Sequence, residues 1–320
     1  MPPNKARIPE LHHGWQPPSR GQRPGFSETF PFPLRYLGGD EPLAYFDTGD
    51  PAAPSGEPDG APLLLIHGLG GNFTHWEHVA GAMARHRRVL GLDLPGYGDS
   101  ARPRADGGRC SMAHYAHACV RLLDALDVER AVFCGHSMGG QVVAEAALAH
   151  PARVERLVLL SANGFVRRPV WQRLGRHLIF HEPLVVSIME RLAVRLLHAC
   201  FGERNHHAVR FIAQAEGRPE HPTLDEFAAT TCSLAGELVE RHYLDDLHRI
   251  AQPTLVIWGD RDRLIPFHDV PEWAARLPDG RLVVLDGCGH LPMIERPAEV
   301  VEALRAFLAD DARASLQPTG

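Results

Sequence analysis

The chain contains 320 residues, of which 44% are hydrophobic and 22% charged, enough for one large α/β domain or two ordinary domains. Its 33 basic and 39 acidic residues give a net charge of −6, which excludes a strongly basic surface built to neutralise phosphates, so we expect no nucleic-acid partner. No apolar run approaches the roughly 18 residues of a transmembrane helix, so we expect no integral membrane association. Residues 1–30 hold no apolar stretch of signal-peptide length, and we therefore expect a cytoplasmic protein.

Strand and helix patterns follow one another along most of the chain. Residues 1–30 are rich in proline and polar side chains and predict a flexible leader. Beyond them, short apolar runs predict strands at Leu34–Leu37, Leu43–Asp47, Leu63–Ile66, Val89–Asp93, Ala131–Cys134, Arg156–Ser161, Thr254–Trp258 and Leu282–Leu285. Helical patterns lie near residues 74–85, 111–126, 138–149, 268–277 and 297–309. This alternation predicts an α/β fold with a mostly parallel central sheet that is covered by helices on both faces.

One long segment, residues 165–250, interrupts this alternation with helical patterns alone. Apolar or small side chains recur there at three- or four-residue steps, at Val185, Met189, Leu192, Leu196 and Cys200. We expect a helical lid over the carboxyl edge of the sheet, with the α/β core at 31–164 and 251–312. The predicted substrate pocket under this lid includes Trp171, Phe180, Met189 and Leu192. Packing within the lid would explain the same apolar stripe.

The cysteines and histidines show no spacing typical of metal ligands. None of the six cysteines forms a CxxC pair. The histidine pairs at 12–13, 75/78, 114/117 and 206–207 have no cysteine or carboxylate partner at ligand spacing. We therefore expect surface histidines, and neither a metal nor an organic cofactor.

The strongest chemical signal is the sequence GHSMGG at residues 135–140. It directly follows a predicted strand and directly precedes a predicted helix. A G-x-S-x-G motif at such a turn holds a nucleophilic serine in a strained conformation with its Oγ exposed. The motif therefore predicts Ser137 as a nucleophile. The alternative is a tight glycine-rich turn with a helix-capping serine.

A nucleophilic serine requires a base, and the base requires an orienting carboxylate. His290 lies between glycines and Pro292, just after the last predicted strand, where a loop could bring it to the sheet edge. Asp260 and Asp262 both follow the strand Thr254–Trp258, and either could orient the histidine. The order Ser, Asp, His along the chain is that of α/β-hydrolases.

Acyl transfer also requires hydrogen-bond donors for the oxyanion. The sequence HGLGG at residues 67–71 directly follows a buried predicted strand. We expect the backbone N–H groups of Leu69 and of Met138, the residue after the nucleophile, to be the two donors. His67 belongs to this loop and is interpreted as structural.

Taken together, the chain from about residue 34 to 309 resembles an α/β-hydrolase of the serine esterase/lipase type with a helical lid. The resemblance is carried by HGLGG (67–71), DLPGYGDS (93–100), GHSMGG (135–140), WGDRD (258–262) and GCGH (287–290). By position, it implies Ser137 as nucleophile, Asp262 as acid and His290 as base.

The same motifs also indicate which activities of related enzymes are disfavoured for this chain. Epoxide hydrolases and haloalkane dehalogenases carry an aspartate where Ser137 stands, which disfavours both. Carbon–carbon bond hydrolases share the triad, but their oxyanion loop usually continues Gly-Pro-Gly and their elbow often has Asn before the serine. Residues 70–72 (GGN) and His136 depart from both features.

These motifs predict a serine hydrolase that cleaves a carboxylic ester or a related small-molecule acyl substrate through an acyl-enzyme. Two alternatives stay open. One is a carbon–carbon bond hydrolase of dienoate-type diketones. The other is a ligand receptor that keeps the fold and the triad without turnover.

Overall fold

An eight-stranded sheet forms the centre of the computed structural model, which describes residues 30–50, 60–102, 110–167, 180–216 and 224–314. The strand order is β1-β2-β4-β3-β5-β6-β7-β8. The first two strands are antiparallel to their neighbours and the other six are parallel. The strands are β1 (Leu34–Leu37), β2 (Leu43–Asp47), β3 (Leu63–Ile66), β4 (Val89–Leu92), β5 (Ala131–His136), β6 (Val154–Leu160), β7 (Thr254–Gly259) and β8 (Gly280–Leu285).

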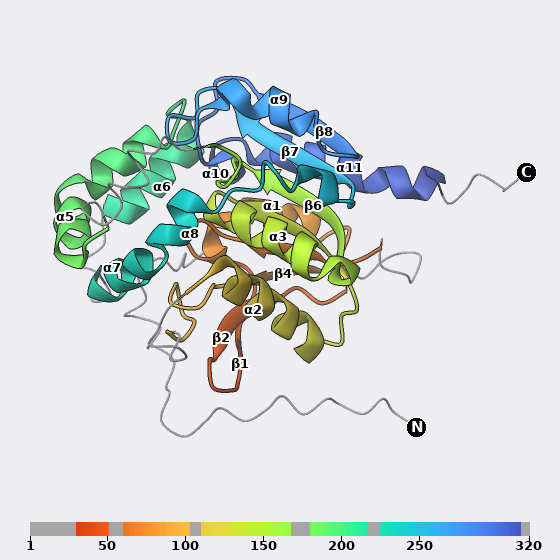
Figure 1. The fold of residues 1–320 in the computed structure, drawn as a ribbon, viewed down its shortest axis with the longest axis horizontal. Helices are drawn as coiled ribbons and strands as arrows, with labels where there is room; N and C mark the ends of the chain where they lie inside the picture. The colour runs from red at the N-terminus through yellow and green to blue at the C-terminus, as the bar shows by residue number, and fades with distance from the viewer. Residues whose placement is uncertain (1–29, 51–59, 103–109, 168–179, 217–223, 315–320) are drawn as a thin grey trace, which may run out of the picture.

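Helices cover both faces of this sheet (Figure 1). They are α1 (Glu77–Met83), α2 (Met112–Ala125), α3 (Met138–Ala149), α9 (Val270–Ala274), α10 (Pro292–Glu295) and α11 (Pro297–Ala314). Side chains alternate between faces along a strand, so Leu64 and Ile66 of β3 pack with α2 and α3, while Leu63 and Leu65 pack with α1 and α11. All four are fully buried, which explains why the strand is apolar at every position. The predicted α/β fold is confirmed.

The helical segment between β6 and β7 contains α5 (Glu182–Ala199), α6 (His206–Glu216), α7 (Leu224–Ser233) and α8 (Ala235–Glu240). In Figure 1, α5, α6 and α7 gather at one end of the core. Helix α5 packs against α6 and α7, and α6 also packs against α10 of the core. The prediction of an inserted helical region is confirmed.

Two predicted helices are shorter in the structure because 3₁₀ turns precede them. The turn η2 (Phe73–Trp76) is capped by the Asn72 side chain, which accepts from Thr74 N–H, and leads into α1. The turn η6 (Phe267–Asp269) precedes α9, and Pro271 lies in the first turn of that helix, where its missing N–H costs nothing. Helix α10 was not predicted, because four residues are too few for a periodic pattern.

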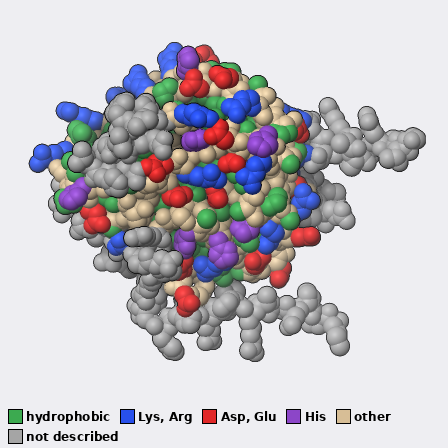
Figure 2. All heavy atoms as spheres, viewed as in Figure 1, with side chains coloured by type: hydrophobic (Ala, Val, Ile, Leu, Met, Phe, Trp, Pro, Cys, Tyr) green, Lys and Arg blue, Asp and Glu red, His purple; other side chains and the backbone are tan. Residues whose placement is uncertain are grey.

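The surface is mixed in charge. Figure 2 shows acidic and basic side chains interspersed on the face in view. Within the described ranges, no helix combines the length and apolarity needed to cross a membrane. The predicted leader lies outside the described residues, apart from Phe30, which is buried beside Phe46 and Phe73.

Candidate active site

Ser137 occupies a sharp turn between β5 and α3. Its backbone angles are φ 52° and ψ −117°, a conformation that costs a non-glycine residue about 1–3 kcal/mol. The Ser137 N–H donates to the carbonyl oxygen of Leu160 at 3.0 Å, and its own carbonyl oxygen accepts from Gly140 and Asn163 at 2.9 Å each. These bonds keep the residue in its strained conformation.

The two glycines of the motif are required by close backbone approaches. A Cβ atom on Gly135 would collide with the carbonyl oxygen of Gly139. A Cβ atom on Gly139 would lie 2.5 Å from the carbonyl oxygen of Ile66 and 2.6 Å from that of His67. The second contact packs the turn at Ser137 directly against the end of β3 and the loop that follows it.

The side chains of Ser137, His290 and Asp262 form a chain of two hydrogen-bond contacts. Nε2 of His290 lies 3.0 Å from Ser137 Oγ, and Nδ1 lies 2.7 Å from Asp262 Oδ2. Since a carboxylate only accepts, Nδ1 carries the proton, and Nε2 is left to accept one from the serine hydroxyl. This arrangement can remove the serine proton as its oxygen attacks an electrophile.

The two candidate aspartates lie in different surroundings. Asp262 is buried, and its Oδ1 accepts from the N–H groups of Leu264 and Ile265 at 2.9 Å each. Both carboxylate oxygens are therefore engaged and the side chain is held facing His290. Asp260 is exposed. The geometry favours Asp262 over Asp260 as the orienting carboxylate.

The predicted oxyanion loop lies beside the serine. A Cβ atom on Gly68 would be 3.0 Å from Ser137 Cβ, so the amide of Leu69 follows at the next position along the loop. Met138 is the first residue of α3, where helical N–H groups have no partner within the helix. Among the described residues, neither the Leu69 nor the Met138 amide donates to another backbone or side-chain acceptor. Both amides therefore stay candidate donors to an oxyanion.

His67 stabilises the loop through both ring nitrogens. Nε2 accepts from the N–H of Leu94 at 2.9 Å, so Nδ1 carries the proton and donates to the carbonyl oxygen of Gly68 at 2.8 Å. Complete burial lowers the pKa of His67 to about 4, against a smaller opposing effect of the bond to Gly68. The imidazole is therefore neutral at physiological pH, in keeping with its predicted structural role.

His136, the residue before the nucleophile, contributes a contact that the sequence did not reveal. Its Nε2 donates to the carbonyl oxygen of His290 at 2.7 Å, and the two rings lie 4.9 Å apart. Burial, reinforced by the neighbouring His290, lowers the pKa of His136 well below its usual range. Its place in GHSMGG was the only available signal, and that signal does not show a partner 154 residues away.

The predicted pocket residues have mixed placements. Trp171 lies outside the described residues, Met189 lies within α5, and Leu192 is 38% exposed. Phe180 is half-buried against the core. Phe227 of α7, which was not predicted for the pocket, lies against the oxyanion loop, because a Cβ atom on Gly70 would be 3.2 Å from its ring.

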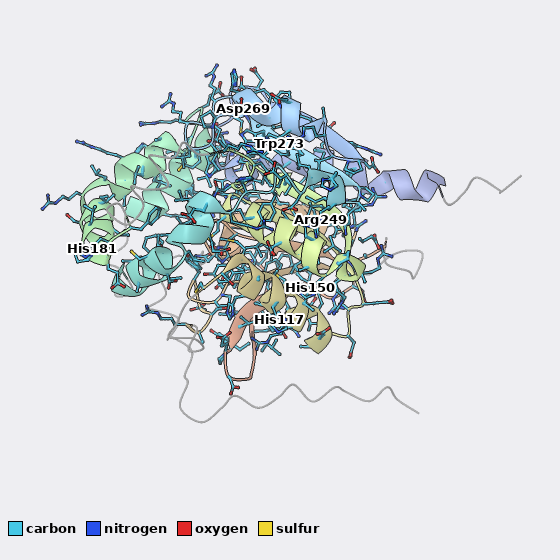
Figure 3. All side chains as sticks on the ribbon, viewed as in Figure 1. His117, His150, His181, Arg249, Asp269 and Trp273 are labelled. Atoms are coloured by element: carbon cyan, nitrogen blue, oxygen red, sulfur yellow. The ribbon has the colours of Figure 1, made fainter. Side chains whose placement is uncertain are left out.

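Some histidines outside the triad lie close to another histidine. His117 of α2 and His150, the residue after α3, have ring centroids 6.5 Å apart, and Figure 3 labels both. His114 lies 3.1 Å from Glu41. In the part of the chain that the structure describes, no three His, Cys, Asp or Glu side chains converge as a metal site would require.

Comparison with known proteins identifies the family. The model of the Alpha/beta hydrolase family matches residues 63–303, so the chain belongs to the alpha/beta hydrolase family. The match spans both the strands on either side of the helical insertion and the insertion itself.

Relatives within this family differ in the reaction that their names describe. A 2-hydroxymuconate semialdehyde hydrolase of Pseudomonas sp. is 32% identical over 262 residues, which cover 78% of this chain and 88% of that protein. A pimeloyl-[acyl-carrier protein] methyl ester esterase of Aeromonas hydrophila is 29% identical over 252 residues, covering 78% and 96%. The structure of a thermophilic esterase from Thermogutta terrifontis, 26% identical, matches with a TM-score of 0.68 over 87% of this chain and 98% of that one.

Proposed function

We propose that the protein is a serine hydrolase that cleaves carboxylic esters of small molecules through an acyl-enzyme. The observation that carries this proposal is the continuous contact from Ser137 Oγ through His290 to the buried Asp262. A strained serine at a strand-to-helix turn, beside two candidate oxyanion donors, supports the same reaction.

In the proposed reaction, His290 Nε2 takes the proton of Ser137 as Oγ attacks the ester carbonyl. The amides of Leu69 and Met138 donate to the resulting oxyanion. The tetrahedral intermediate collapses by breaking the C–O bond, and His290 returns the proton to the departing alkoxide, which leaves as an alcohol. Water, deprotonated by His290, then attacks the acyl-enzyme and releases the acid and free Ser137. Asp262 stabilises the imidazolium in both halves of the cycle.

The helical insertion is proposed to be the lid of this site. Phe227 of α7 contacts the oxyanion loop at Gly70, and Gly96 of the loop after β4 packs against Thr230 of the same helix. Helix α7 therefore closes over the side of the site where the acyl oxygen would bind. An acyl group bound beside the oxyanion loop would meet the ring of Phe227, which favours an apolar acyl portion.

Carbon–carbon bond hydrolysis is the second candidate function. It is supported by the 32% identity to the semialdehyde hydrolase. The loop at residues 70–72 (GGN) favours esters, because it departs from the Gly-Pro-Gly that carbon–carbon bond hydrolases usually carry. Asn72, the third residue, instead caps a 3₁₀ turn with its side chain.

The test is a panel of soluble esters, thioesters, lactones and ring-fission dienoates, assayed with the wild-type chain and with Ser137→Ala. We expect ester turnover that continues past one equivalent per site, which a receptor without turnover would not show. A serine-directed phosphonate should add one mass label, at Ser137. Full activity in Ser137→Ala, or a label elsewhere, would exclude the proposed mechanism, and turnover of dienoates alone would favour the second candidate.

A further inference from the structure

The buried carboxylate of Glu295 accepts three backbone hydrogen bonds, one of them from the residue next to the proposed base. The residue is 1% exposed at the end of α10. Its Oε1 accepts from the N–H of Glu203 at 2.8 Å, and its Oε2 accepts from those of Gly202 at 3.2 Å and Gly289 at 3.0 Å. A buried carboxylate is costly unless its oxygens are hydrogen-bonded, so this set of donors is what allows Glu295 to be there.

The three donors come from two segments that are distant in the sequence. One is the insertion turn, residues 200–203 between α5 and α6, and the other is the His290 loop, residues 287–290. These segments lie in direct backbone contact. The N–H of His290 donates to the carbonyl oxygen of Cys200 at 2.6 Å, and a Cβ atom on Gly202 would collide with the main chain of the His290 loop. Glu295 therefore joins the helical insertion to the loop that carries the proposed base.

The main chain of Glu295 is also held by hydrogen bonds. The N–H of Glu295 donates at 2.8 Å to the carbonyl oxygen of Leu291, the residue before α10. Its carbonyl oxygen accepts from the Asn205 side chain at 2.5 Å, and the Asn205 Oδ1 accepts from the N–H of Ala208 near the start of α6. The main chain of Glu295 thus adds a second connection to the insertion.

We propose that Glu295 is a positioning residue that fixes His290 against Ser137 and couples this geometry to the insertion turn. The inference rests on the proposed function, because it assigns His290 as the base. The near-attack geometry of a base is sensitive to small displacements, and a shift of about 1 Å can cost about 10²-fold in rate. A carboxylate suits this role because it has acceptor sites for all three N–H groups. A glutamine would offer one oxygen, and its NH₂ group would face N–H donors.

The experiment compares Glu295→Gln with Glu299→Gln, a matched control four residues further along, in the first turn of α11. The Glu299 side chain is 50% exposed and lies 3.8 Å from Arg296. The first readout is hydrogen–deuterium exchange, which does not depend on any substrate. We expect Glu295→Gln to speed exchange at the amides of Gly202 and Gly289 together, and Glu299→Gln to leave both unchanged.

The second readout is the rate at which a serine-directed phosphonate labels Ser137. We expect a fall of roughly tenfold to 10²-fold in Glu295→Gln, with a similar fall in kcat on an ester and a smaller change in KM. In a His290→Ala background, Glu295→Gln should cause no further loss, because a residue that acts through His290 has nothing left to position. An equal further loss there would show a general structural role and overturn the inference.

The outcomes separate this inference from the proposed function. Labelling of wild type at Ser137 without ester turnover would contradict the proposed function. Hydrogen–deuterium exchange and the labelling rate would still test whether Glu295 positions His290. Wild-type turnover with an unimpaired Glu295→Gln variant would defeat the inference alone. Thermal unfolding of each variant establishes that the folded state is being compared.

Discussion

Asp262 Oδ2 lies 2.7 Å from His290 Nδ1 although 28 residues separate the two along the chain. Each comes from a loop at the carboxyl end of a parallel strand, Asp262 after β7 and His290 after β8, and these strands are neighbours in the sheet. Adjacent parallel strands deliver their following loops to one edge, so the pairing is a direct result of the topology.

This pairing predicts different outcomes for two similar substitutions. Asp262→Asn should lower turnover by up to ~10⁴-fold, because an amide in this position supports the wrong tautomer of His290. Asp260→Asn should retain most activity, since Asp260 is exposed. Steady-state kinetics on one ester, with circular dichroism to establish folding, makes the comparison. A reversed order of the two variants would assign Asp260 as the acid.

The close approach at Gly139 predicts that an alanine there lowers the free energy of unfolding. An alanine at Gly81, which has open space around it, should not. In Gly139→Ala the new Cβ would meet two backbone oxygens, those of Ile66 and His67, which cannot rotate away. We expect a loss of roughly 1–3 kcal/mol or more in the free energy of unfolding, and reduced activity because the oxyanion loop is displaced. Gly81→Ala in α1 meets nothing within 4 Å and should stabilise the chain by about 0.5–1 kcal/mol. Urea denaturation measures both, and equal effects would refute the steric explanation.

The buried neutral His67 predicts that stability falls in mild acid. Its pKa is about 4 in the folded chain against an ordinary value of 6.5, so the unfolded chain binds more protons between these values. The contribution is complete above pH 6.5 and is lost as the pH falls toward 4, by about 2 kcal/mol between pH 7 and pH 5.

His67→Gln should remove that part of the pH dependence, because glutamine does not titrate. The variant can still accept from Leu94, but it is expected to be less stable than wild type at pH 7. The measurement is urea denaturation at both pH values, with the exposed His248→Gln as a control that keeps the wild-type dependence. The explanation fails if His67→Gln loses as much stability between pH 7 and pH 5 as wild type does.

Phe227 predicts a change in acyl preference. Its ring lies against Gly70 of the oxyanion loop, so Phe227→Ala should open space beside the acyl group. In wild type, each added methylene should improve binding by at most ~0.8 kcal/mol until the pocket is full. The variant should shift the optimum to longer chains, as measured by kcat/KM over an ester series. Leu184→Ala, at a 43% exposed position of α5, should leave the series unchanged.

Features that depend on neighbours along the chain were predicted well. The continuous apolar run of β3 and the strand-to-helix turn at Ser137 are local patterns, and both elements lie where the sequence placed them. The three side chains proposed as the triad each lie within hydrogen-bond distance of another member, because each follows a strand end in the expected order.

Features that depend on contacts between distant segments were not predicted. Glu295 meets Gly202 across 93 residues, and His136 meets His290 across 154. Both contacts involve main-chain atoms, which carry no residue-specific pattern in the sequence. The position of Phe227 was missed for a similar reason, since a helical pattern gives the face of α7 but not the loop on which that face packs.

The placement of the helical insertion bears on whether it could be exchanged for the insertion of another family member. The chain leaves the sheet at the end of β6 and returns at the start of β7, and these two strands are hydrogen-bonded neighbours, with Leu160 paired to Ile257. The hydrogen bonds between these two strands therefore involve no residue of the insertion. An insertion from another family member could be grafted here to carry its selectivity with it, provided that the graft reproduces a backbone turn able to donate two N–H groups to Glu295.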